Sequence, residues 1–196
     1  MDERLLTGTM RMNEANHLEI GGVDTVSLVE KYGTPVYVYD ISQIKYKART
    51  FKKAFQDRNI KAQVAYASKA FSCLAVYQLM AKEEMSLDVV SGGELFTAIQ
   101  AEYPNKKIHF HGNNKSDSEI IAALDYDIGC FVVDNFYELS KLNEYTKQRQ
   151  QKVSILLRVT PGVEAHTHEY ITTGQTDSKF GFDLENGQAQ QALKMS

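Results

Sequence analysis

The chain has 196 residues, of which 43% are hydrophobic and 24% are charged, and its formal net charge is −3. This length suits one domain or part of a larger one, and the hydrophobic fraction allows a large core. The charge balance argues against binding to nucleic acid or to an anionic membrane surface. We find no apolar run long enough to span a bilayer, and the polar N-terminal sequence leads us to expect no signal peptide.

The two cysteines, Cys73 and Cys130, fall in segments that predict a helix and a buried strand. Disulfides are rare in the reducing cytosol, and free cysteines are often buried like small apolar side chains. We therefore expect both residues to be reduced core thiols and the protein to be cytoplasmic.

The first part of the chain predicts a helix at 24–33, with Asp24 as its N-cap and Gly33 as its end. The segment PVYVYD at 35–40 is β-branched and aromatic, which predicts a strand. Apolar and basic positions at helical spacing then predict a second helix at 41–57.

From residue 62 onward, patterns typical of strands and helices alternate. Strands are predicted at 62–67, 86–90, 106–111, 128–133 and 152–159; helices are predicted at 70–83, 91–103, 117–125 and 135–150, and a last helix from Asp183 follows a polar loop at 160–181. Short apolar strands that alternate with helices predict an α/β fold with a parallel sheet. A doubly wound sheet and a (β/α)₈ TIM barrel both fit. Since a barrel has eight units and takes about 250 residues, a barrel here would hold only about five of them.

Polar and titratable residues concentrate where the predicted strands end. In both architectures the active site lies beyond the carboxyl ends of the parallel strands. The residues at these ends are Lys69, Asp88, His109, His111, Asp134, Arg158 and Thr160. We therefore expect a functional site at this edge of the sheet.

Lys69 is the most informative of these residues. It lies in VAYASKAF, and its neighbours Ala67, Ser68 and Ala70 are small enough to leave room around the amine. A desolvated lysine amine is nucleophilic and can form a Schiff base with an aldehyde such as pyridoxal phosphate. A solvated lysine that extends from a strand end into water explains the same pattern.

Two other motifs have two interpretations each. The backbone amides of SGGE at 91–94 can bind an anion at a helix start, or the glycines can allow close packing of the helix. Arg158, at the end of an apolar strand, is a candidate to bind an anion or an internal carboxylate, and a purely structural ion pair explains it equally well.

Two pairs of histidines have the spacing H-x-H. His109 and His111 lie on the same side of a predicted strand, and His166 and His168 lie in the polar loop. Such pairs occur as metal ligands, but no acidic or cysteine ligand set accompanies them. We therefore predict no metal site.

Several motifs together resemble the diaminopimelate decarboxylase family, from about residue 17 to the C-terminus. They are AYASKA, LDVVSGGEL, IHFHGNNKS and HTHEYITTGQTDSKFG, and they occur in this order. The last motif is specific to this family within its fold group. YASKA and SGGE are shared more loosely with ornithine and arginine decarboxylases.

The resemblance implies a fold-type III pyridoxal-phosphate enzyme with an alanine-racemase-like barrel followed by a β-domain. The implied reaction converts a small amino acid, meso-2,6-diaminopimelate, to L-lysine and CO₂ in the last step of lysine biosynthesis. Lys69 matches the lysine that binds pyridoxal 5'-phosphate covalently, and Asp88, His111 and Arg158 match positions that line the cofactor pocket. The segment 178–181 matches one near the active site and the dimer interface. The resemblance also implies that the full-length protein is a homodimer.

The resemblance also implies a domain organisation. Residues 1–40 would be an N-terminal extension that packs on a β-domain, and residues 41–196 would be an incomplete barrel. The histidine that stacks on the cofactor ring, the glycine-rich phosphate loop and the glutamate at the pyridine nitrogen would lie beyond residue 196. The chain is therefore expected to be an N-terminal fragment that is inactive alone.

Three alternatives remain open. A related ornithine- or arginine-type decarboxylase shares YASKA and SGGE. A non-catalytic pyridoxal-phosphate-binding protein on the same barrel would also retain Lys69. A metal-dependent barrel hydrolase would use the H-x-H pairs instead.

Overall fold

The computed structural model describes residues 6–162 and 180–196. The chain divides into two compact units, residues 1–64 and 65–196. His166, His168 and Ser178, which the sequence analysis singled out, lie outside the described residues.

The first unit combines a small antiparallel sheet with two helices. Its elements are β1 (Arg11–Met12), β2 (Leu18–Ile20), β3 (Val23–Asp24), α1 (Thr25–Tyr32) and α2 (Ile41–Gln56). The Asp24 side chain caps α1 by accepting hydrogen bonds from the backbone amides of Val26 and Ser27. Gly33 ends this helix with a φ of 77°, as the sequence predicted.

The prediction of a strand at 35–40 is wrong. These residues adopt no regular secondary structure, and within the described residues no strand pairs with them. Their apolar side chains are exposed, and Tyr37 reaches 91%. β-branched and aromatic residues favour a strand only where a neighbouring strand bonds the backbone and covers the side chains. Asp40, the last residue of the segment, instead caps α2 by accepting from the amide of Gln43 at 3.0 Å.

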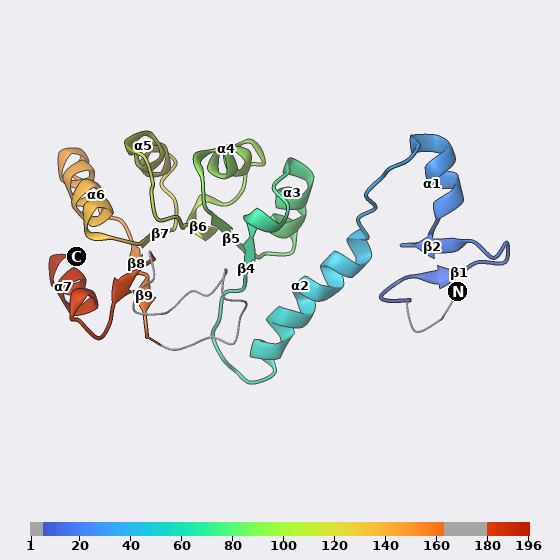
Figure 1. Cartoon of the computed structure of the whole chain (residues 1–196), viewed down its shortest axis with the longest axis horizontal. Coiled ribbons are helices and arrows are strands. Elements are labelled where there is room, and N and C mark those ends of the chain that lie inside the picture. The colour runs from blue at the N-terminus through green and yellow to red at the C-terminus, as the bar shows by residue number, and fades with distance from the viewer. Residues whose placement is uncertain (1–5, 163–179) are drawn as a thin grey trace. The chain divides into compact units, whose positions relative to one another are not determined.

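The second unit is built on a parallel sheet whose strands follow one another in chain order. The strands are β4 (Ala65–Ala67), β5 (Ser86–Val89), β6 (Ile108–Phe110), β7 (Cys130–Val133) and β8 (Ile155–Leu157); the helices are α3 (Leu74–Lys82), α4 (Gly92–Gln100), α5 (Asp117–Asp125) and α6 (Phe136–Arg149), with short 3₁₀ helices η2 (Ser68–Ala70) and η3 (Asn105–Lys107). The predicted parallel sheet is thus confirmed. Helices α3 to α6 lie along the same side of the sheet (Figure 1). This arrangement is that of a barrel segment, because a doubly wound sheet carries helices on both faces.

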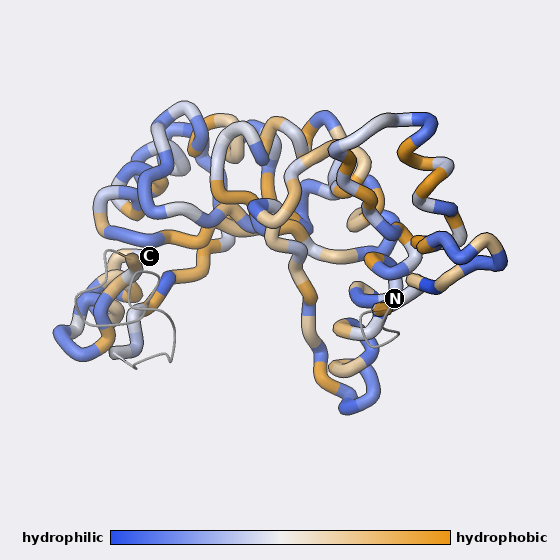
Figure 2. The backbone as a smooth tube through the Cα atoms, turned by 45° about the vertical axis from the view of Figure 1, so that its right-hand side comes forward, coloured by the Kyte–Doolittle hydropathy of each residue, from blue (hydrophilic) through white to orange (hydrophobic). Residues whose placement is uncertain are grey.

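The core of this unit lies between the sheet and its helices. Leu87, Phe110 and Phe131 from the strands are buried, as are Leu95 and Ile120 from the helices. Along the helices, hydrophobic and hydrophilic stretches alternate (Figure 2), as expected for helices that bury one side. Packing in this apolar core therefore fixes the positions of the strand ends and of the residues that follow them.

Helix α3 begins later than predicted, because the residues around Lys69 form η2 before the helix starts at Leu74. The last helix, α7 (Gln188–Met195), also begins later than the predicted Asp183. There, β10 (Phe182–Asp183) pairs in parallel with β9 (Val159–Thr160). The Asp183 carboxylate then accepts hydrogen bonds from the backbone amides of Glu185 and Asn186, within a turn that precedes α7.

Both cysteines are free thiols, and Cys130 is buried as predicted. The prediction of a core thiol is wrong for Cys73, which is only half-buried because it precedes the first residue of α3. In the part of the chain that the structure describes, the helices are too short or too polar to cross a membrane.

Candidate functional site

A pocket of about 610 Å³ lies at the carboxyl ends of the strands in the second unit. Its lining residues are Ala67, Lys69, Asp88, Val90, His111, Gly112, Asn113, Val132, Arg158 and Phe180. The structure thus brings together the four residues that the sequence analysis proposed for the cofactor pocket: Lys69, Asp88, His111 and Arg158. Its volume is in the range typical of small-molecule sites.

Lys69 is positioned by the buried residue before it. Ser68 is fully buried, and its hydroxyl donates to Glu94 Oε2 at 2.5 Å. The backbone amide of Val90 donates to the same oxygen at 2.7 Å. Glu94 therefore links the end of β4 to the end of β5, while the side chain of Lys69 stays exposed at the pocket.

Asp88 contacts both histidines of the H-x-H motif, of which His109 lies in β6 and His111 follows it. Its Oδ1 lies 3.0 Å from His109 Nδ1, and its Oδ2 lies 3.6 Å from His111 Nε2. Burial acts to raise the pKa of Asp88, but the hydrogen bonds and charges of the two histidines outweigh it and hold the pKa well below its usual value. Asp88 is therefore a fixed negative charge that orients the imidazole of His111 at the pocket.

Among the described residues, His109 and His111 have no set of further metal ligands around them. Across residues 6–162 and 180–196, no three His, Cys, Asp or Glu side chains are placed to hold a metal ion. The hypothesis of a metal-dependent hydrolase thus finds no ligand set in these ranges.

Arg158 pairs with an internal carboxylate, one of the options left open by the sequence. Its Nη1 donates to Asp134 Oδ1 at 3.1 Å, and the Asp134 side chain is only 3% exposed. The other oxygen of Asp134 accepts from the backbone amide of Gly181 at 3.2 Å. The ring of Phe180 lies 4.4 Å from the guanidinium. The Arg158 cation is therefore held from two sides.

Gly181 is suited to this contact by its lack of a side chain. Its φ is 77°, and a Cβ atom there would lie 2.8 Å from the carbonyl oxygen of Arg158. Residues with a side chain rarely adopt this conformation, and the added atom would force the backbones apart.

The SGGE motif binds an anion, but this anion is a carboxylate of the chain itself. The backbone amide of Gly92 donates to Glu119 Oε1 at 2.6 Å. A Cβ atom on Gly92 would lie 2.9 Å from Glu119 Cγ, so the glycine also permits a close approach. This amide at the start of α4 thus binds a carboxylate of the neighbouring helix α5.

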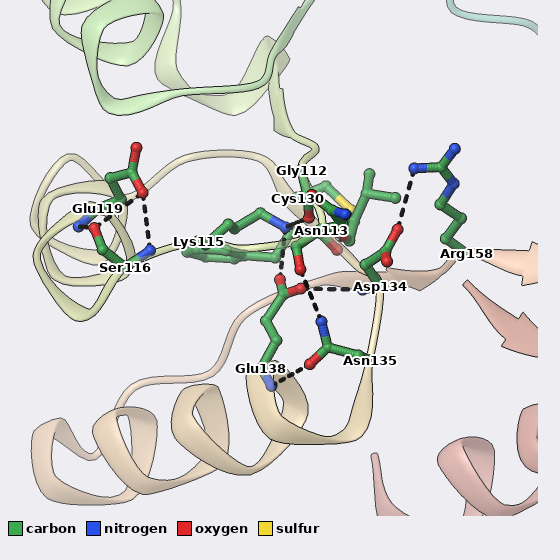
Figure 3. Close-up of polar contacts among 12 residues, drawn as sticks. Gly112, Asn113, Lys115, Ser116, Glu119, Cys130, Asp134, Asn135, Glu138 and Arg158 are labelled. Carbon is green, nitrogen blue, oxygen red and sulfur yellow. Dashed lines mark hydrogen bonds and ion pairs between the residues drawn. The ribbon is translucent and has the colours of Figure 1, made fainter. Parts of the chain in front are cut away.

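The sequence analysis missed a buried ion pair beside the pocket. Lys115 Nζ lies 2.7 Å from Glu138 Oε1, and both side chains are almost fully buried (Figure 3). Lys115 belongs to the quoted motif IHFHGNNKS, yet its local pattern does not distinguish it from a surface lysine. Glu138 occupies the third position of α6, where a glutamate is ordinary for a helix start.

Comparison with known families explains this collection of residues. Residues 41–196 match the family described as pyridoxal-dependent decarboxylase, pyridoxal binding domain. The chain belongs to the pyridoxal-dependent decarboxylases. The prediction of pyridoxal phosphate as the cofactor is thereby confirmed at the level of the family.

Two curated relatives support the resemblance found in the motifs. The chain is 61% identical to a diaminopimelate decarboxylase from Bacillus methanolicus over 96% of this chain and 44% of the relative, and 60% identical to one from Bacillus subtilis over 96% and 43%. The resemblance to diaminopimelate decarboxylase is therefore confirmed. The chain spans less than half the length of these curated relatives.

A solved structure supports the barrel. Diaminopimelate decarboxylase from M. jannaschii, in complex with L-lysine, matches with a TM-score of 0.82 and 39% identity, over 95% of this chain and 44% of that one. The predicted fold, part of a pyridoxal-phosphate-binding barrel, is confirmed.

The pocket residues fit the cofactor of the pyridoxal-dependent decarboxylases. Pyridoxal phosphate carries an aldehyde, an aromatic ring and a phosphate, which call for an amine, a flat wall and positive charge. The pocket offers the exposed amine of Lys69, the imidazole of His111 and the guanidinium of Arg158. One wall is bare backbone at Gly112, where a Cβ atom would lie 3.1 Å from the carbonyl oxygen of Val90.

Proposed function

We propose that the full-length protein decarboxylates meso-2,6-diaminopimelate to L-lysine and CO₂, the last step of lysine biosynthesis. The observation that carries this proposal is the meeting of Lys69, Asp88, His111 and Arg158 at one pocket. Identity of 61% to a diaminopimelate decarboxylase supports the choice of substrate.

In this proposal Lys69 holds the cofactor through its amine. When bound, pyridoxal phosphate withdraws electrons from the substrate carbon that loses CO₂. Ala67 and Ser68, which precede Lys69, are small and leave space around its amine. The hydrogen bond from Ser68 to Glu94 fixes the backbone from which the Lys69 side chain extends.

The other proposed site residues bind and orient. Arg158 supplies a positive charge for an anionic group, and Asp134 and the Phe180 ring limit its movement. Asp88 stays negatively charged, because the histidines lower its pKa, and it holds His111 toward the pocket. We propose cofactor-binding roles for Asp88, His111 and Arg158, and a catalytic role for Lys69.

The test is product identification with the full-length protein. Purified protein is supplied with pyridoxal phosphate and meso-diaminopimelate, and L-lysine and CO₂ are quantified. Equal amounts of the two products, with none when the cofactor is removed, are expected. Binding of pyridoxal phosphate without turnover of any amino acid would instead favour the non-catalytic alternative.

A related ornithine- or arginine-type decarboxylase is the second candidate. The motifs YASKA and SGGE favour it, because these enzymes share them. The same assay with L-ornithine and L-arginine distinguishes the two candidates.

We also propose that the full-length protein is a cytoplasmic homodimer. The free thiols of Cys73 and Cys130 are consistent with a reducing compartment. Residues 1–40 are proposed to form an extension that packs on a β-domain, and residues 41–196 to form part of the barrel domain. Light scattering of the full-length protein measures the oligomeric state.

A further inference from the structure

A buried ion pair lies directly behind the candidate cofactor pocket. The side chains of Lys115 and Glu138 are 1% and 3% exposed, and their charged atoms are 2.7 Å apart. Neither residue lines the pocket, so neither is placed to touch a bound cofactor. Their contacts nevertheless lead to the pocket wall.

Lys115 bonds two residues of the pocket wall. Its ammonium donates to the carbonyl oxygens of Gly112 and Val132, both at 2.9 Å. The third donor of the ammonium is directed at Glu138. All three N–H groups are therefore used, and two of them fix the backbone of pocket-lining residues that follow β6 and end β7.

Glu138 extends the connection, by way of Asp134, to Arg158, a third pocket-lining residue. Its Oε2 accepts from the backbone amide of Asp134 at 3.0 Å, and the Asp134 side chain binds Arg158 (Figure 3). The next residue, Asn135, donates from its side chain to the carbonyl oxygen of Asn113, another pocket residue, at 3.1 Å. The start of α6 is thereby tied to both sides of the pocket.

We propose that Lys115 and Glu138 are positioning residues that set the cofactor pocket by fixing the backbone at Gly112, Val132 and Asp134. This inference rests on the proposed function, since it takes the pocket to bind pyridoxal phosphate. The pair links the ends of three strands, β6, β7 and, through Asp134 and Arg158, β8.

A role in stability alone does not require charges at this position. Burial lowers the pKa of Lys115 and raises the pKa of Glu138, and the attraction between the two groups opposes both changes. Replacing a buried ion pair by apolar side chains of similar size is often neutral or stabilising. What apolar side chains cannot supply is the set of directed hydrogen bonds to the wall.

The double variant Lys115→Met/Glu138→Met separates the two roles. It removes both charges together and keeps the side-chain volume, whereas either single variant would leave an unpaired buried charge and fold poorly. The control is Leu142→Ala, which makes a cavity in α6 at a buried residue that does not line the pocket. Both are made in the full-length protein, and each is measured by thermal unfolding and by titration with pyridoxal phosphate.

We expect the double variant to unfold cooperatively and to bind pyridoxal phosphate with a Kd raised about tenfold or more. The absorption spectrum of the bound cofactor is expected to shift, because the wall around it is no longer fixed. The Leu142→Ala control should lose thermal stability while its Kd and spectrum match those of the wild type.

Other outcomes have distinct meanings. A folded double variant with the wild-type Kd and spectrum would overturn the inference and leave the proposed function intact. A Kd that rises equally in the control would assign the effect to lost stability and also overturn it. Failure of the wild-type protein to bind pyridoxal phosphate would instead overturn the proposed function.

Discussion

Asp134 and Arg158 form an ion pair of 3.1 Å between the ends of neighbouring parallel strands, β7 and β8. The Asp134 carboxylate is buried, and it also accepts a hydrogen bond from the backbone amide of Gly181, which lies 47 positions further along the chain. Asp134 thus binds both the guanidinium of Arg158 and the backbone at Gly181.

Asp134→Ala is expected to destabilise the full-length protein by about 1–3 kcal/mol, because it leaves the half-buried amide of Gly181 unpaired and Arg158 without its carboxylate. Urea denaturation measures the change. Asp57→Ala is the control, since Asp57 pairs with Lys53 at the surface, where an ion pair is worth about 1 kcal/mol or less. Equal losses in both variants would contradict the prediction.

Lys69→Ala is expected to abolish turnover, because the cofactor loses its covalent attachment. Borohydride reduction of the full-length protein, followed by peptide mapping, should place the pyridoxyl group on Lys69. Lys106→Ala removes an exposed lysine outside the pocket and should keep activity within about twofold of wild type, since surface substitutions of this kind rarely matter. A label on a different lysine would refute the assignment.

Asp88 should make stability depend on pH in the acid range. Its folded-state pKa lies below the usual 3.8, because the histidines outweigh the effect of burial. The stabilisation is therefore present above about pH 4 and is lost as the pH falls through the lowered pKa. We expect the difference in unfolding free energy between wild type and Asp88→Asn to shrink below that pH. A difference independent of pH from 6 to about 3 would exclude this linkage.

The choice of substrate is expected to follow the diaminopimelate decarboxylases. The full-length protein should show a higher kcat/KM for meso-diaminopimelate than for L-ornithine, because its relatives of about 60% identity carry that name. Steady-state kinetics with both substrates and added pyridoxal phosphate provide the measurement. A preference for ornithine would support the second candidate.

Residues 1–196 produced alone are expected to be inactive and to aggregate or unfold without cooperativity. Among the described residues β4 pairs with β5 only, and Leu156 and Leu193 are exposed. Unpaired strand edges and apolar faces favour aggregation. Net stability is typically about 5–15 kcal/mol, so the loss of the closing contacts of a barrel can remove all of it. Circular dichroism on heating is the test, and one sharp transition from a monomer would disprove the prediction.

Local patterns in the sequence were sufficient for most of the fold. The cap at Asp24, the five strands and the order of the helices between them were predictable, because each element depends on residues within a few positions. The position of Lys69 and Arg158 at one edge of the sheet was also predictable, because the carboxyl ends of parallel strands lie at the same edge.

Contacts between distant residues decided the rest. The pattern at 35–40 is that of a strand, but strand formation depends on a neighbour, and none pairs with it in the described residues. The delayed start of α7 likewise results from the pairing of Phe182 with Val159.

By itself, the sequence determined the parallel α/β fold, the resemblance to diaminopimelate decarboxylases and the residues at the strand ends. Only the tertiary structure showed that Lys115 and Glu138 are a buried pair that bonds the pocket wall. The physical reason is that periodicity reports which residues share a face of one element. The partner of a buried charge is instead set by how distant segments pack together, and Lys115 and Glu138 are 23 positions apart along the chain.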